Sequence, residues 1–246
     1  MYQFFVADEQ VCDDKIFITG SDVNHISNVL RMKPGEKIRV SDKSKKAYFC
    51  HIENIAADEV CAVIDSVDEN GTELSNEIYL FQGLPKSDKM ELIIQKAVEL
   101  GACGIIPVAM KNCVVKLDDK KAANKVRRWQ TIAESAAKQS KRTVIPNVEM
   151  PIMWRDIFQK TKNLDVVLVP YENERGMTAT REVIESILPG QSVGIIIGPE
   201  GGFDVSEISQ VDETDNMHRI SLGRRILRTE TAGMAALSML VYELDE

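Results

Sequence analysis

Residues 193–203 read Val-Gly-Ile-Ile-Ile-Gly-Pro-Glu-Gly-Gly-Phe. The β-branched run at 195–197 is typical of a strand that is buried on both faces. It ends at one proline and three glycines, and glycine leaves no side chain to keep a ligand away from the backbone. Asp204 follows as a predicted N-cap, with Glu207 three residues later to complete a capping box. The stretch therefore predicts a strand, a ligand-sized loop and a helix.

A second unit of the same kind follows, and residues 219–233 read Arg-Ile-Ser-Leu-Gly-Arg-Arg-Ile-Leu-Arg-Thr-Glu-Thr-Ala-Gly. A strand is expected at 219–222, then a second glycine loop, and Thr229 is a candidate cap for the terminal helix. Because ligands bind at the carboxyl ends of strands in open α/β sheets, the two loops predict one pocket. Gly233 and Ala236 would let another backbone approach this helix, either within the fold or from a second subunit.

The pattern of predicted elements changes near residue 74, which divides the chain into two predicted domains, 1–74 and 75–246. In the second domain, strands expected at 78–82, 104–109 and 165–169 alternate with helices starting near 88, 121 and 178, which predicts an α/β fold with a mainly parallel sheet. Residues 1–74 contain short β-rich runs, which predict a small barrel with a helix capped by Ser21 or Asp22. The boundary is placed in the polar stretch 68–76.

Composition sets limits on the function. The five cysteines are scattered and the three histidines lie far apart, so we expect no metal site and reduced thiols, as in a cytoplasmic protein. No apolar run approaches the roughly 18 residues that span a bilayer, so no membrane partner is expected. The net charge is −8, yet residues 111–142 carry +7 and the remainder −15. This basic segment indicates a phosphate-binding surface or, alternatively, an ordinary solvated helix face.

The first loop does not match the common nucleotide-binding patterns. It is neither a G-x-G-x-x-G fingerprint nor a Walker A loop, which would need Gly-Lys-Ser/Thr. A nucleotide-binding α/β enzyme, which would bind ATP or NAD, is therefore weakly supported.

Five segments in order resemble one known family: residues 25–35, 86–97, 134–142, 197–203 and 222–233. The chain is similar over its full length to bacterial small-subunit ribosomal RNA uridine-N3 methyltransferases of the RsmE type, within the SPOUT superfamily. The resemblance implies a PUA-like β-barrel followed by a SPOUT domain with a carboxyl-terminal trefoil knot. It also implies S-adenosylmethionine as methyl donor, a homodimer, and N3 methylation of a specific uridine in small-subunit (16S) ribosomal RNA. One departure is Gln3, where the family often has a basic residue.

The resemblance and the loops together give candidate site residues. The candidates for donor binding are Pro170, Gly198, Pro199, Glu200, Gly201, Ile220, Leu222, Gly223 and Leu227. The candidates for catalysis, which the sequence does not rank, are Arg228, Glu200 and Glu230, because uridine N3 must lose a proton before it attacks a methyl group. The candidates for RNA binding are Arg31, Lys89, Lys138 and Arg142. The alternative function is a non-catalytic RNA-binding or ribosome-assembly factor, which would have no use for a donor pocket.

Overall fold

A computed structural model describes residues 1–69 and 71–245, and the chain forms two compact units. The first unit consists of Met1–Glu73 together with Ala137–Ile145, and the second of Leu74–Ala136 together with Pro146–Glu246. The segment Ala137–Ile145 lies within the range 75–246 that the sequence assigned to one domain, but here it groups with the first unit. Since this segment is part of the basic stretch, its surroundings decide which of its charges reach solvent.

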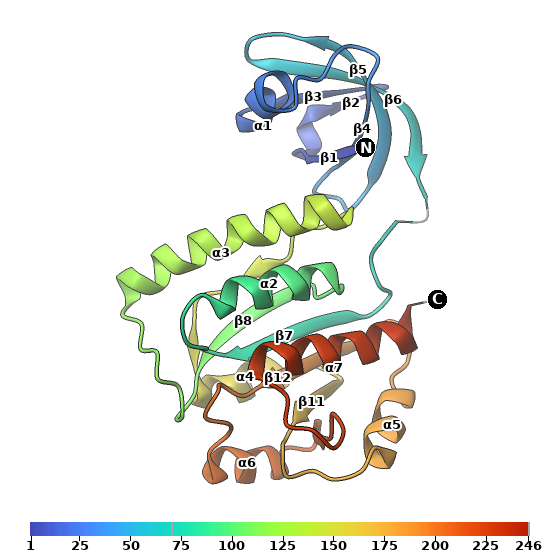
Figure 1. The fold of residues 1–246 in the computed structure, drawn as a ribbon. Helices are drawn as coiled ribbons and strands as arrows, with labels where there is room; N and C mark the ends of the chain where they lie inside the picture. Colours follow the sequence, from blue (N-terminus) through green and yellow to red (C-terminus); the bar gives the residue numbers. More distant parts are fainter. Residues whose placement is uncertain (70, 246) are drawn as a thin grey trace. The chain divides into compact units, whose positions relative to one another are not determined.

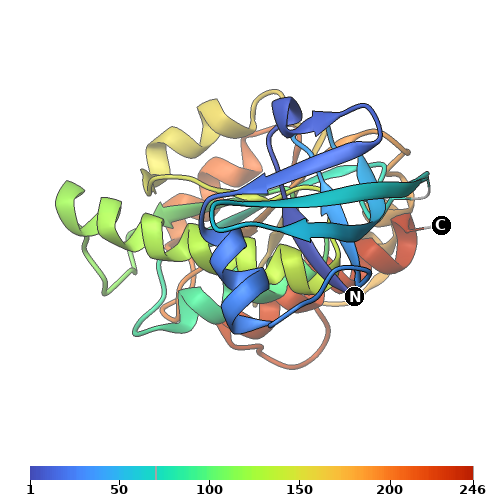
Figure 2. The same ribbon diagram turned by 90° about the horizontal axis from the view of Figure 1, so that it is seen from above.

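The first unit is built on a six-stranded sheet in the order β1-β4-β5-β6-β3-β2. Its strands are β1 (Tyr2–Phe5), β2 (Val11–Cys12), β3 (Lys15–Thr19), β4 (Lys37–Ser41), β5 (Ala47–Ile55) and β6 (Glu59–Asp68). All neighbours are antiparallel except β1 and β4, and no pairing joins β1 to β2 among the described residues. Figure 2 shows these strands in blue to cyan as a strongly twisted sheet. The prediction of a small β-rich domain is confirmed.

The short helical segment of this unit differs from its predicted capping. Helix α1 (Ser21–Asn24) continues into a π-helical turn, η2 (His25–Val29), and its N-cap is Gly20. The prediction that Ser21 or Asp22 caps the helix is wrong, because both residues lie inside it. The Asp22 carboxylate instead accepts a hydrogen bond from Lys138 at 3.0 Å. A 3-10 turn, η1 (Asp8–Gln10), was not predicted.

The second unit contains a seven-stranded sheet in which every pairing is parallel. The order is β10-β8-β7-β12-β11-β13, with β9 paired to β8. The strands are β7 (Glu77–Gly83), β8 (Gly104–Ala109), β9 (Asn147–Val148), β10 (Ile152–Met153), β11 (Val166–Pro170), β12 (Ser192–Ile197) and β13 (Met217–Ile220). The parallel α/β architecture is confirmed. Strands β9 and β10 were not predicted, because two residues are too few to show a period.

Helices cover the two faces of this sheet (Figure 1). They are α2 (Lys89–Glu99), α3 (Asp119–Ser140), α4 (Ile157–Thr161), α5 (Thr178–Glu185), α6 (Val205–Asp212) and α7 (Thr229–Leu244), with a 3-10 turn, η3 (Trp154–Asp156), before α4. On one face, Ile157 and Val211 of α4 and α6 join a buried cluster with Ile196 of β12. On the other face, α7 packs against β12 and α2.

The small residues of α7 lie inside the fold. A Cβ atom on Gly233 would lie 3.8 Å from Ile197 and 3.9 Å from Leu80, and Ala236 is buried. Of the two alternatives for this face, the structure therefore selects packing on the sheet of the same chain. No helix among the residues described is both long and apolar enough to traverse a lipid bilayer.

The two predicted helix caps have different outcomes. The Asp204 side chain accepts from the Ser206 amide, and Glu207 completes the capping box, as predicted. The prediction for Thr229 is wrong, since the N-cap of α7 is Arg228 and Thr229 is the first helical residue. The Thr229 hydroxyl is therefore available for other partners.

Candidate functional site

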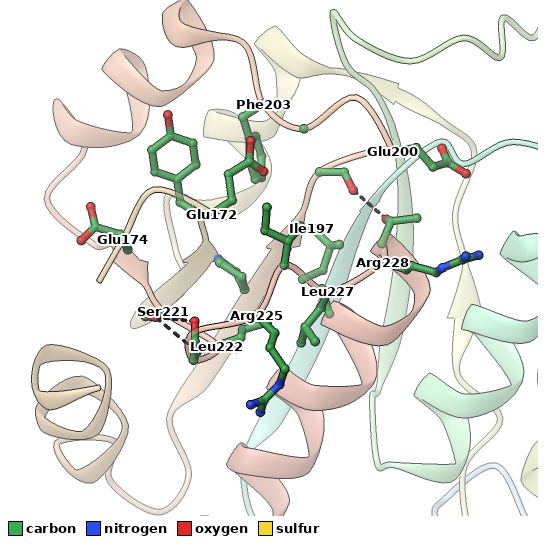
Figure 3. A pocket seen from close by; sticks show the side chains of 18 of the residues that line it. Glu172, Glu174, Ile197, Glu200, Phe203, Ser221, Leu222, Arg225, Leu227 and Arg228 are labelled. Atoms are coloured by element: carbon green, nitrogen blue, oxygen red, sulfur yellow. Dashed lines mark hydrogen bonds between the residues drawn. The ribbon is translucent and has the colours of Figure 1, made fainter. Parts of the chain in front are cut away.

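A pocket of about 440 Å³ lies where β11, β12 and β13 end. The loops after these strands line it, together with the start of α7 and Lys89 at the start of α2. Figure 3 shows Ile197 and Leu227 between two polar sides, one with Glu172 and Glu174 and the other with Glu200 and Arg228. The two predicted glycine loops therefore meet in one pocket, as the strand topology requires.

Most of the residues predicted to hold a donor line this pocket. These are Pro170, Gly198, Pro199, Glu200, Leu222, Gly223 and Leu227. Two others do not line it: Ile220 is buried, and a Cβ atom on Gly201 would meet Asn112 at 3.0 Å. Sequence reasoning missed further lining residues, among them Tyr171, Glu172, Arg175, Phe203, Ser221 and Arg224.

Gly83, at the end of β7, sets the position of the first glycine loop. A Cβ atom on this residue would lie 2.7 Å from the nitrogen of Pro199 and 3.0 Å from the carbonyl carbon of Gly198. Both are backbone atoms, so no side-chain rotation relieves the overlap. Only glycine lets the central strand approach the loop this closely. The sequence offered no signal for this contact, because the two segments lie far apart in the chain.

A buried hydrogen-bond chain ties the first loop to the sheet and to α7. The Gln82 amide donates to the Thr229 hydroxyl at 2.9 Å, and this hydroxyl donates to the Gly198 carbonyl at 2.7 Å. Gln82 is fully buried and Thr229 nearly so. The two hydrogen bonds orient the Gly198 carbonyl in the pocket wall, while the side-chain oxygen of Gln82 is buried without a hydrogen-bond partner among the described residues.

A second buried threonine holds the other loop. The Thr180 hydroxyl of α5 accepts from the Ser221 amide at 2.9 Å and donates to the Ser221 carbonyl at 3.1 Å. The Ser221 hydroxyl in turn accepts from the amide of Gly223, whose φ of 104° lies in the region that favours glycine. Each glycine loop is thus held by a threonine from a neighbouring helix.

Two of the candidate catalytic carboxylates share one cation. The Lys89 ammonium lies 3.1 Å from Glu200 and 3.1 Å from Glu230. Lys89 was predicted to bind RNA, which stays a prediction, and the structure brings it together with two predicted catalytic residues. The hydrogen bonds to Glu200 and Glu230 raise the pKa of Lys89.

The protonation of these carboxylates follows from their surroundings. Burial raises the pKa of Glu200, but its own backbone amide, Lys89 and the Lys86 amide lower it by more, so the pKa lies below its usual value. The pKa of Glu230 is lowered in the same way, against the effect of burial, by its own amide and by Lys89. A lowered pKa favours the ionised form of both carboxylates, which suits them as partners of Lys89.

Arg228 has different surroundings from the two carboxylates. It lines the pocket and is exposed. Within residues 1–69 and 71–245, no carboxylate forms an ion pair with its guanidinium group. The charge of Arg228 lowers the pKa of Glu230, but a cation without an ion pair at the pocket wall can also stabilise an anion that forms there.

The other residues predicted to bind RNA lie in the first unit. Arg31 is exposed, with a φ of 53°, and Lys138 is ion-paired to Asp22 at 3.0 Å. Arg142 is only 3% exposed, and its guanidinium binds the Glu73 carboxylate, with Nε at 3.0 Å from Oε2. The RNA-binding role of these residues stays a prediction, and the contacts of Arg142 give it a packing role.

Gln3 belongs to the same buried polar group as Arg142. Its amide donates to the carbonyl oxygen of Arg142, and its own carbonyl accepts from Arg39 at 3.1 Å. Arg39 is in turn ion-paired to Asp68 at 2.6 Å. The residue in which the sequence departs from the resembled family is therefore a packing residue, which ties β1 to the segment Ala137–Ile145.

The pocket fits a donor such as S-adenosylmethionine. Its volume lies in the range of small-molecule sites, and its lining combines apolar residues with glycines and charged residues. At Gly223 nothing lies within 4 Å of a Cβ atom built on the backbone, so the loop leaves free space at the wall. Among the described residues, no group of three or more His, Cys, Asp or Glu side chains could hold a metal ion.

Comparisons with known proteins identify relatives of both units. A family model described as an RNA methyltransferase domain matches residues 72–241, and one described as an RNA methyltransferase PUA domain matches residues 18–65. Ribosomal RNA small subunit methyltransferase E of Bacillus subtilis is 41% identical over 232 residues, which cover 93% of this chain and 90% of that protein.

Two solved structures align with nearly the whole chain. One is ribosomal RNA small subunit methyltransferase E from Neisseria gonorrhoeae bound to S-adenosyl methionine, with a TM-score of 0.85, 30% identity, and coverage of 98% of this chain and 97% of that chain. The other is a methyltransferase from Legionella pneumophila in complex with SAM, with a TM-score of 0.83, 31% identity and the same coverage. Their folds extend over both units described above.

Proposed function

Because the chain belongs to the ribosomal RNA small subunit methyltransferase E family, we propose that it methylates N3 of a specific uridine in 16S ribosomal RNA. The protein is an S-adenosylmethionine-dependent ribosomal RNA methyltransferase. The observation that supports the proposal most directly is the pocket formed by two glycine loops at the ends of β12 and β13. A purely RNA-binding assembly factor would have no use for such a pocket.

The donor would be held by the two glycine loops. Backbone groups of Gly198, Gly202 and Gly223 would meet its polar edges, while Ile197, Leu222 and Leu227 would pack on its apolar surface. When bound, S-adenosylmethionine supplies an electrophilic methyl group through its sulfonium. The task of the protein is then to orient donor and acceptor.

The acceptor must lose its N3 proton before it can attack the methyl group. We assign stabilisation of the resulting uridine anion to Arg228, because this residue lines the pocket and its charge has no ion pair among the described residues. Glu200 and Glu230 are committed to Lys89 and have lowered pKa values. Through Lys89 they would fix the position of the first glycine loop relative to the start of α7, rather than accept the N3 proton.

We propose that the protein binds S-adenosylmethionine and its demethylated product, but neither ATP nor NAD. The loops offer backbone groups and no Gly-Lys cradle for a triphosphate. Titration calorimetry of the purified protein with all four compounds measures this directly. Binding of ATP without binding of the donor would contradict the proposal and favour a nucleotide-dependent enzyme.

The proposal also includes a homodimer that acts in the cytoplasm and a trefoil knot in the carboxyl-terminal segment. Since Gly233 and Ala236 are buried against the sheet, the dimer contact would use the outer face of α7, where Tyr242 is 88% exposed. Sedimentation at micromolar concentration should give a dimer, and Tyr242→Glu should shift it toward the monomer. A wild-type monomer under these conditions would contradict the proposal.

A further inference from the structure

Residues 224–226 present an unusual combination of side chains to solvent. Arg224 and Arg225 are exposed, and Ile226 between them and Leu227 is 85% exposed. In the part of the chain that the structure describes, neither guanidinium has an ion-pair partner. The chain has 38 acidic and 30 basic residues, so carboxylates are abundant, yet none of the described carboxylates forms an ion pair with these arginines.

The charges around the pocket mouth reinforce this surface. Of the carboxylates that line the pocket, Glu174 lies 3.1 Å from Arg219, and Glu200 is paired with Lys89. Glu172 is the lining carboxylate that has no ion pair among the described residues. Arg175 and Arg228 also line the pocket without an ion pair in that part of the chain. The uncompensated charge at the mouth is therefore positive, although the protein as a whole is acidic.

We propose that Arg224, Arg225 and Ile226 form the surface that receives the acceptor RNA strand, a proposal that rests on the proposed function. The guanidinium groups would bind the phosphates on either side of the target uridine, and Ile226 would pack against a neighbouring base. Figure 3 shows Arg225 and Arg228 pointing to different sides from the same loop. On this proposal, Arg225 would face the strand and Arg228 the reacting base.

The chemistry of the acceptor explains this combination of side chains. Uridine N3 lies on the edge that pairs with other bases, so the target must be unpaired and turned out of its stack. An extended strand offers phosphates to guanidinium groups, and an apolar side chain fills the space beside a base that has been turned out. The loop joins β13 to α7 beside the donor pocket, which is where such a strand has to pass.

The test compares RNA binding with donor binding. The variants are Arg224→Glu with Arg225→Glu, and Ile226→Ala. The matched control is Arg181→Glu, since Arg181 is an exposed arginine of α5 that does not line the pocket and has no ion pair among the described residues. The probe is a short single-stranded RNA containing one uridine, with small ribosomal subunits from cells lacking this gene as the methylation substrate.

The double variant should bind the RNA about tenfold more weakly, and the slope of log affinity against log salt should fall by about 1.4, because two phosphate contacts are lost. Its donor affinity, measured by calorimetry, should change much less than its RNA affinity. Ile226→Ala should keep the slope and lower kcat/KM by about tenfold, the scale of one lost contact with a base. Arg181→Glu should behave as the wild type.

Three results would overturn the assignment. RNA affinity and salt slope that are unchanged in the double variant would show that the strand passes elsewhere. An equal loss in Arg181→Glu would show that only total charge matters. Conversion of a dimer to a monomer by either variant would assign the loop to contact between two copies of the chain. If the wild type does not methylate the subunits but still binds RNA through this loop, the proposed function is contradicted. The assignment of residues 224–226 to RNA binding would then still hold.

Discussion

Replacement of Arg228 by alanine should lower the rate of methyl transfer by about 10² or more while the donor still binds. This is the scale for removing one group that stabilises charge formed in the transition state. Arg228 lines the pocket, and in the described part of the chain no carboxylate forms an ion pair with it, although its charge lowers the pKa of Glu230. It can therefore lower the effective pKa of uridine N3 as an opposite charge nearby does.

The dependence of the rate on pH separates this role from a structural one. Raising the pH should partly restore the rate of Arg228→Ala, because more uridine then ionises without the cation. Arg228→Lys should recover less than its charge suggests, since a point ammonium cannot copy the planar fork of a guanidinium. Single-turnover rates across neutral and alkaline pH, with calorimetric donor affinity, provide the measurement. Loss of donor binding with an unchanged pH profile would make Arg228 structural.

Replacement of Gly83 by alanine should weaken donor binding by about fivefold to 150-fold, because relief of such overpacking costs about 1–3 kcal/mol. The added methyl group would lie 2.7 Å from the Pro199 nitrogen, so the loop from Gly198 must move away from β7. That movement also strains the hydrogen bond from Thr229 to the Gly198 carbonyl. Calorimetry with S-adenosylmethionine measures the loss, and thermal unfolding reports any accompanying loss of stability.

Gly233→Ala provides the matched control. A Cβ atom at this position meets its neighbours only at 3.8 Å or more, and alanine favours the helix by about 1 kcal/mol over glycine. This variant should keep wild-type donor affinity and unfold at the same or a higher temperature. Equal donor affinity in Gly83→Ala and the wild type would mean that the first loop does not shape the donor site.

Much of the site could be predicted because its signals are local. The Ile195–Ile197 run, the glycines after it and the Asp204 capping box each specify their conformation within a few residues, and the structure has them as predicted. The resemblance of five segments gave the family, which the comparisons confirm. The parallel alternation predicted that the two loops would meet at one edge of the sheet, and both line one pocket.

The sequence says least where the contacts of a residue depend on a distant partner. Lys89 had the charge expected of an RNA contact, but it lies between Glu200 and Glu230. Arg142 belonged to a basic stretch, yet it is buried against Glu73. Net charge along a segment does not reveal which cations are paired, since pairing depends on which carboxylates the fold brings within a few ångströms.

By itself the sequence determined the main strands and helices of the α/β domain and the two glycine loops, because periodicity and glycine content depend on neighbours in the chain, and the resemblance of five segments gave the family and the class of donor. The tertiary structure alone decided that Thr229 holds a loop rather than caps a helix, that Gly83 must be glycine, and that Arg228 forms no ion pair among the described residues while Glu200 and Glu230 do. Each of these depends on atoms that are distant in sequence and meet only after folding, within the few ångströms over which hydrogen bonds, overlap and ion pairs act.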